Sequence, residues 1–152
     1  HIYVLSNTQK YGGGGIYNFY GISAAHHPNR TGKIYVHEFG DVLLGLGDEY
    51  IGNVSYNDMY PTDVEPWEAN LTTLTDFGRK EWKKMLDTKT PVPTPVNEKT
   101  PQKLGVYEGG GYVNKGVYRP WPNCLMNNLH TIDIFCPVCS QAIRKQIDFL
   151  CR

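Results

Sequence analysis

One stretch of the sequence decides how the chain is interpreted: Val36-His37-Glu38-Phe39-Gly40-Asp41-Val42-Leu43-Leu44-Gly45-Leu46-Gly47-Asp48-Glu49-Tyr50. The apolar residues of positions 33–46 predict a helix of about three turns, which is a common length in globular proteins. Gly45 and Gly47 are suited to end that helix, because glycine tolerates the left-handed conformation found at helix C-termini.

The polar residues of this helix have the spacing of a metal site. His37 and Asp41 are one turn apart and therefore share a face, as two metal ligands on one helix must. Glu38 stands beside the first ligand, where a carboxylate can act as general base on a metal-bound water. Position 41 is His in the usual zinc-peptidase pattern, and here it is Asp. By itself the pentapeptide of residues 37–41 is a weak motif, because many helices carry this pattern as ordinary polar residues of their surface.

Composition favours a single globular domain over residues 1–152. Hydrophobic residues make up 40% of the chain, and Lys+Arg (15) balances Asp+Glu (15). A nucleic-acid partner is not expected, because a binding face should bring a basic surplus. A membrane span is not expected either, since no apolar run approaches about 18 residues.

The remaining segments predict an α+β chain that is rich in loops. We expect residues 6–15 to form a glycine-rich loop, residues 26–29 a turn and residues 88–101 an extended loop. The regular elements expected are strands at residues 2–5 and within 16–25, helices at 76–87 and 136–150, and a hairpin at 105–118.

The cysteines are concentrated near the end of the chain, and their spacing leaves several possibilities open. An even number in one segment suits one or two local disulfides. Free buried thiols, a four-thiolate zinc site and a redox-active Cys-x-x-Cys pair are the alternatives. The residues concerned are Cys124, Cys136, Cys139 and Cys151.

Taken together, the motifs resemble those of the bacterial immunoglobulin A peptidase family of zinc metallopeptidases. The family pattern is approximately V-H-E-x-G-H-x-x-x-G-L-x-D-E-Y, and residues 36–50 follow it except at Asp41. Three further segments resemble family motifs and occur in the same order: Tyr11-Gly12-Gly13, Tyr118-Arg119-Pro120 with Cys124-Leu125-Met126, and Phe135-Cys136-Pro137-Val138-Cys139.

The resemblance implies a zincin- or metzincin-like α+β fold. A twisted sheet would pack on the active-site helix, followed by a Met-containing turn and a C-terminal helix. An edge strand, formed by residues 2–5 or 16–25, would line the cleft and bind extended substrates by strand addition. The chain would be the C-terminal catalytic portion of a larger protein that is secreted or on the cell surface, in a bacterium.

The resemblance also assigns roles to individual residues. His37 and Asp48 would be zinc ligands, and Asp41 would be a substitute for the second His. Glu38 would be the catalytic base, and Tyr118 could stabilise the developing oxyanion. Met126 would be an apolar floor beneath the metal. If the chain is secreted, we expect Cys136 or Cys139 to be bridged to Cys124.

Asp41 has consequences for activity, whichever role it takes. A carboxylate can bind zinc, but Asp is shorter than His. Two carboxylates with His37 leave a Zn²⁺ site formally neutral, so the pKa of its water should rise above the roughly 7 of active zinc hydrolases. Three outcomes are open: a working variant site, a site that binds metal but is weakly active, and a site that has lost metal.

The leading interpretation is zinc-dependent hydrolysis of peptide bonds in a protein or glycoprotein, which by resemblance alone would be immunoglobulin-like. The alternative is a non-catalytic module that grips a peptide or glycoprotein in a degenerate peptidase cleft. A third interpretation is a structural fragment, in which His37, Glu38, Asp41 and Asp48 would not converge.

Overall fold

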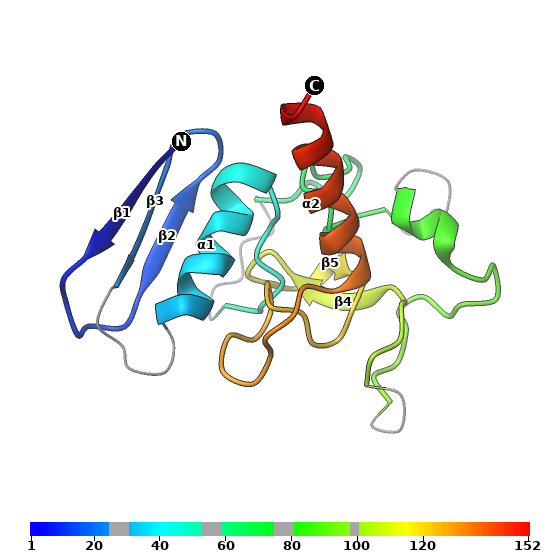
Figure 1. Cartoon of the computed structure of the whole chain (residues 1–152). Helices are drawn as coiled ribbons and strands as arrows, with labels where there is room; N and C mark the ends of the chain where they lie inside the picture. Colours follow the sequence, from blue (N-terminus) through cyan, green and yellow to red (C-terminus); the bar gives the residue numbers. More distant parts are fainter. Residues whose placement is uncertain (25–30, 53–58, 75–80, 98–100) are drawn as a thin grey trace.

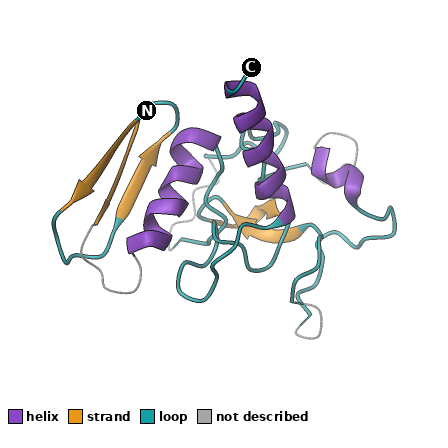
Figure 2. Ribbon diagram, in the orientation of Figure 1, coloured by secondary structure: helices purple, strands orange, loops and turns teal. Residues whose placement is uncertain are grey.

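A computed structural model describes residues 1–24, 31–52, 59–74, 81–97 and 101–152. It confirms an α+β chain with two helices and small sheets (Figures 1 and 2). The elements are β1 (Ile2–Ser6), β2 (Gly13–Ile16), β3 (Tyr20–Ala24), α1 (Thr31–Leu44), a short 3-10 helix (Glu81–Met85), β4 (Tyr107–Gly110), β5 (Val113–Arg119) and α2 (Pro137–Leu150). The turn expected at 26–29 lies outside the described residues.

The first sheet has three strands in the order β1-β3-β2 and packs against α1 (Figure 1). β1 runs parallel to β3, whereas β2 pairs antiparallel to it and forms one edge. The prediction of a loop over residues 6–15 is therefore wrong for its last three glycines. Glycine has low strand propensity, but Gly13 and Gly15 approach α1 so closely that a side chain at either position would collide with the helix.

Alternate glycines of β2 face α1, as the two-residue period of a strand requires. A Cβ on Gly15 would fall 2.8 Å from Val42 Cγ2 and 3.1 Å from the Glu38 carbonyl oxygen. A Cβ on Gly14 would meet nothing within 4 Å. The face of β2 that carries Gly13 and Gly15 therefore packs closely on α1, whereas the face that carries Gly14 is open.

Helix α1 matches the predicted helix with ends shifted by two residues. Its buried face includes Ile34, His37, Glu38 and Val42, which follow helical spacing. Gly45 has a φ of 60°, so the helix ends at a left-handed glycine as expected.

The second sheet is the predicted hairpin, and it joins β4 to β5 through Gly111 and Tyr112. Helix α2 is also confirmed: Cys136 is its N-cap residue, and Pro137 stands in its first turn, where no backbone N–H is needed. Of the helix predicted at 76–87, the described part holds only the 3-10 turn Glu81–Met85.

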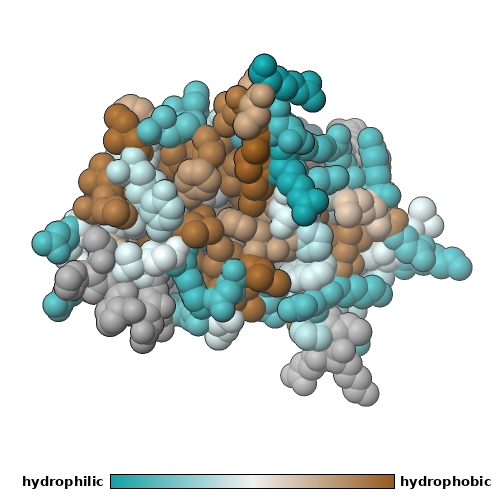
Figure 3. Space-filling view, viewed as in Figure 1, coloured by the Kyte–Doolittle hydropathy of each residue, from teal (hydrophilic) through white to brown (hydrophobic). Residues whose placement is uncertain are grey.

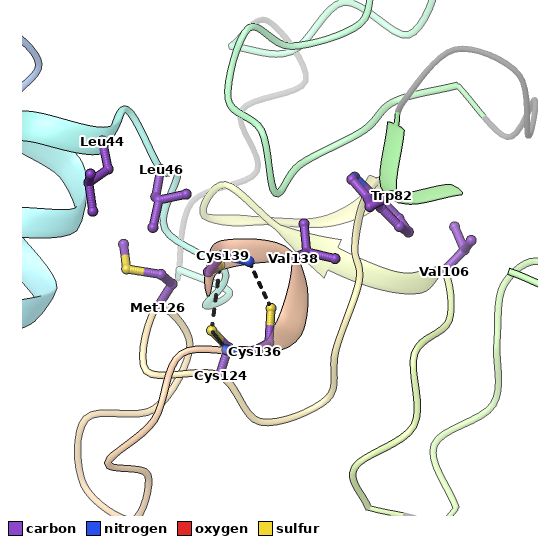
Figure 4. Packing of buried hydrophobic residues seen from close by; sticks show 9 residues of the cluster. All are labelled: Leu44, Leu46, Trp82, Val106, Cys124, Met126, Cys136, Val138 and Cys139. Atoms are coloured by element: carbon purple, nitrogen blue, oxygen red, sulfur yellow. Dashed lines mark hydrogen bonds between the residues drawn. The ribbon is translucent and has the colours of Figure 1, made fainter. Parts of the chain in front are cut away.

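The main core lies between α1, the hairpin and α2 (Figure 4). Its buried residues are Leu44, Leu46, Trp82, Val106, Cys124, Met126, Cys136, Val138 and Cys139. Outside the core, apolar side chains reach the surface over the first sheet and along α2 (Figure 3). Within the described segments, no helix has both the length and the apolar character needed to cross a bilayer.

The cysteine bridge that was expected is absent from the described structure, where all four cysteines are free. The Sγ atoms of Cys124 and Cys139 are 3.7 Å apart, well beyond the roughly 2.05 Å of a disulfide bond. Cys151 is exposed after the last turn of α2 and lies outside the group that the other three form.

The contact between β2 and α1 gives a first prediction. Gly15→Ala should destabilise the protein by about 1–3 kcal/mol, because the new methyl group collides with Val42 and with helix backbone. Gly14→Ala is the matched control, and it should change stability little because its Cβ has open space. Urea unfolding of the two variants measures the difference, and equal stabilities would contradict the close packing described above.

Candidate metal centre

His37 is held by the turn that follows the hairpin. Its Nδ1 lies 3.1 Å from the carbonyl oxygen of Leu125, and the side chain is buried. A carbonyl can only accept, so Nδ1 carries the proton and donates to Leu125. In the neutral imidazole this leaves the lone pair on Nε2, which is the usual arrangement of a metal-binding histidine.

Two carboxylates converge on that nitrogen. Asp48 Oδ1 lies 2.8 Å from His37 Nε2, and Asp41 Oδ2 lies 3.9 Å from it. All three side chains offer ligand atoms within 4.8 Å of one another. The interpretation in which these residues do not converge is therefore excluded, and Asp41 belongs to the same group as His37 and Asp48.

The donor set fits a zinc ion. About 2.0–2.2 Å from each ligand, tetrahedral zinc would separate neighbouring nitrogen and oxygen ligands by about 3.3–3.5 Å. The distance from His37 Nε2 to Asp48 (2.8 Å) is shorter than this value, and the distance to Asp41 (3.9 Å) is longer. In addition, Asp41 Oδ1 is buried without a hydrogen-bond partner among the described residues. Buried carboxylate oxygens of this kind need a cation or a proton.

Glu38 lies beside this group and lines two cavities. One is a cavity of about 350 Å³ lined by the three site residues and by Gly13, Gly14 and Gly15 of β2. The other is a cavity of about 430 Å³ on the side of Tyr11 and His130. Glu38 and His37 line both cavities, so they stand at the centre of a cleft that continues to either side.

The pKa values of the site residues are shifted because three acidic side chains lie close together and are largely buried. Burial lowers the pKa of His37, but contact with Asp48 and the charges of Asp41 and Glu38 outweigh it and raise the pKa to about 9. Burial raises the pKa of Asp41 to about 8, with Asp48 adding to the effect. Burial likewise raises the pKa of Glu38 to about 7. The raised pKa values of the two acids reflect burial and mutual repulsion of carboxylates, and a cation bound among them would favour their ionised forms.

The turn that carries Asp48 is fixed by a buried amide. Asn70 accepts a hydrogen bond from the N–H of Gly47 (2.8 Å) and donates one to the carbonyl oxygen of the same residue (2.8 Å). A side chain at Gly47 would require Leu71 to move, since a Cβ would fall 2.6 Å from Leu71 Cδ1. Asn70 and Leu71 therefore determine where the chain returns to α1.

Tyr112 is a site residue that the sequence did not single out. The Tyr112 hydroxyl donates a hydrogen bond to Asp48 Oδ2. The Tyr50 hydroxyl donates to the Tyr112 hydroxyl at 3.4 Å. Tyr112 has a φ of 67°, an unusual value for a bulky residue, and Gly111 before it has a φ of 57°. Two positive φ angles make the tight turn that carries Tyr112 to the metal centre.

Tyr118 lies elsewhere. It belongs to β5, bridges Thr72 through the backbone, and packs beside the main core. It does not line either of the two cavities that Glu38 borders, whereas Tyr50 lines both. The hairpin thus presents Tyr112 to the candidate centre and directs Tyr118 toward the core.

Met126, which was expected to form an apolar floor beneath the metal, packs in the main core against α1. It is fully buried, and its sulfur would lie 3.0 Å from a Cβ on Gly40 in α1. Its carbonyl oxygen accepts a hydrogen bond from the N–H of Glu49 at 2.8 Å. The Met126 turn therefore contacts both the helix that carries His37 and the segment that carries Asp48.

The chain matches a known protein family. A family model described as IgA peptidase M64 matches the chain over residues 1–100 and 96–147. No curated protein matches it. The match covers nearly the whole chain, including every residue of the candidate centre, and the chain therefore belongs to the IgA peptidase M64 family of metallopeptidases.

Proposed function

We propose that this chain hydrolyses peptide bonds in a protein or glycoprotein with the help of zinc, on a zincin-like scaffold. The observation that carries the proposal is the convergence of His37, Asp41 and Asp48 beside Glu38, in a cleft bordered by an edge strand. His37 Nε2 and one carboxylate oxygen from each aspartate would hold the ion. Zinc in such a site polarises the substrate carbonyl and lowers the pKa of a bound water.

Glu38 is placed to move the proton. It lies beside His37 in sequence and lines the same two cavities, so it faces the space where a water and a substrate carbonyl would meet. Its carboxylate takes a proton from the attacking water and passes it to the nitrogen of the leaving amine. The C–N bond breaks, the carbonyl carbon keeps the water oxygen, and Glu38 returns to its ionised form.

The edge strand β2 is suited to hold the substrate. Its glycines line the cavity at the candidate centre, and among the described strands β2 pairs with β3 alone, on one side. An extended peptide adding to the free edge would form backbone hydrogen bonds and lie across Glu38. The absence of side chains at Gly13 and Gly14 leaves the space for it. We assign this role to β2, which shares only Ile16 with the expected segment 16–25, because no residue of β1 or β3 lines either cavity.

Asp41 affects both the zinc affinity of the site and the reactivity of the bound metal. A carboxylate in place of imidazole adds one negative charge to the ligand set and makes the metal a weaker Lewis acid. We therefore propose that the native chain binds zinc and cleaves slowly. Asp41→His should raise zinc affinity and cleavage by roughly 10–100-fold, because imidazole removes that charge and reaches further from the helix.

The cavity beside Asp41, of about 350 Å³, has room for the larger ring. Asp41→Asn is the matched control, since it removes the charge without supplying an imidazole. Chelator competition gives the zinc dissociation constants, and cleavage of an unfolded protein gives the activity. If Asp41→His binds no more zinc and cleaves no faster, position 41 is not a ligand position, and a non-catalytic binding role is favoured.

The proton shuttle is tested by Glu38→Gln in the Asp41→His background. The amide cannot accept the water proton, so cleavage should fall by about 10²–10⁴-fold while zinc stoichiometry stays the same. Glu81→Gln is the control, because Glu81 is an exposed carboxylate that pairs with Lys145 away from the cleft. Full activity of the Glu38→Gln variant would remove Glu38 from the mechanism.

Tyr112→Phe tests the hydrogen bond that orients Asp48. Loss of the hydroxyl frees Asp48 Oδ2 to rotate, and zinc affinity should fall about tenfold or more, as it does when the partner of a metal ligand is removed. Tyr107→Phe is the control, since it removes a hydroxyl from the same hairpin that donates to Lys103 instead. Equal zinc affinities in the two variants would contradict an orienting role for Tyr112.

A further inference from the structure

A second cluster of metal-binding groups lies beneath the candidate centre. Three segments meet there: the residue after Asp48, the turn before Met126 and the first turn of α2. They contribute Glu49, Cys124, Cys136 and Cys139, whose ligand atoms all lie within 4.8 Å of one another. Figure 4 shows the three cysteines close together in the core.

The spacing of these atoms is that of ligands around one ion. In a tetrahedral zinc site with Zn–S bonds of about 2.3 Å, neighbouring sulfurs are about 3.8 Å apart, and a sulfur and an oxygen about 3.5 Å apart. Here Cys124 Sγ and Cys139 Sγ are separated by 3.7 Å, and Cys139 Sγ and Glu49 Oε1 by 3.4 Å. A disulfide would instead bring two sulfurs to about 2.05 Å.

A buried carboxylate oxygen points independently to a ligand. Glu49 is 0% exposed, and its Oε1 accepts a hydrogen bond from Asn70 at 2.9 Å. Its Oε2 has no hydrogen-bond partner within the described part of the chain. A buried carboxylate oxygen without a partner is disfavoured, whereas a cation held with the three sulfurs would stabilise it.

Backbone N–H groups also favour negatively charged sulfur here. The N–H of Cys136 donates to Cys124 Sγ at 3.2 Å, and the N–H of Cys139 donates to Cys136 Sγ at 3.4 Å. These donors belong to the N-terminal turn of α2, a 14-residue helix whose positive end faces the cluster. Thiolate, not thiol, is the form that binds metals.

We propose that Glu49, Cys124, Cys136 and Cys139 bind a zinc ion in a closed structural site. Soft thiolates select zinc over harder divalent metals, and four protein ligands leave no position for a substrate. The burial of all four side chains agrees with a structural rather than a catalytic ion. Cys151, exposed at the far end of α2, takes no part.

This second ion would help to hold the residues of the first centre in place. Cys124 precedes Leu125, whose carbonyl oxygen accepts from His37 Nδ1, and Glu49 follows Asp48 directly. Tying Glu49 to Cys124 therefore fixes the two segments that orient His37 and Asp48. The second site stands on its own geometry and does not depend on the first being catalytic.

Cobalt substitution separates the two sites, because thiolate ligands bound to Co²⁺ give an intense near-ultraviolet charge-transfer band that His and Asp ligands do not give. The His37→Ala variant, in which the first site is disabled, should retain the full band and about one zinc ion per chain. Cys151→Ser should leave the band unchanged. Cys136→Ser should reduce it by about a third and should weaken zinc binding at least tenfold.

A measurement on the unaltered chain guards against variants that fail to fold. Zinc should protect three of the four thiols from a thiol reagent, and a chelator should expose them. The proposal is overturned if the unaltered chain shows no thiolate-to-cobalt band, or if its thiols react equally with and without zinc. A mass two hydrogens lower than expected under non-reducing conditions, with Cys124 linked to Cys136 or Cys139, would also overturn it in favour of a disulfide.

Discussion

Two consecutive carboxylates, Asp48 and Glu49, lie in one short segment after α1 and reach two different clusters. Neighbouring side chains of an extended segment point to opposite sides, so one carboxylate meets His37 and the other meets the cysteines. Both are largely removed from water, and each therefore needs compensation. The backbone hydrogen bonds of this segment to Gly111 and Met126 join the hairpin, the Met126 turn and α1 into one unit.

The close packing of β2 on α1 is the second constraint on the site. Glu38 projects toward β2, and a Cβ on Gly13 would fall 2.4 Å from its Oε1. The glycines thus serve the helix and the cleft at once: they admit the buried carboxylate on one face and leave an open strand edge on the other. A larger side chain at Gly13 would displace Glu38, the proposed catalytic base.

Much of this architecture could be predicted from local sequence. Helical spacing brought His37, Glu38 and Asp41 together, and glycine at position 45 indicated where α1 ends. Pairings between distant segments could not be predicted in this way. The contact of Tyr112 with Asp48 spans 64 residues, and it depends on two positive φ angles in the hairpin turn. Cysteine spacing likewise permits a metal, but it gives no sign that Glu49 is the fourth partner.

The proposed function requires that His37, Asp41 and Asp48 surround a metal ion. Anomalous diffraction at the zinc absorption edge, from crystals of the zinc-loaded chain, tests this claim directly. We expect a peak about 2.0–2.2 Å from His37 Nε2 and from a carboxylate oxygen of Asp48, with Asp41 completing the set. A zinc-loaded crystal with no anomalous peak among these three side chains would contradict the claim.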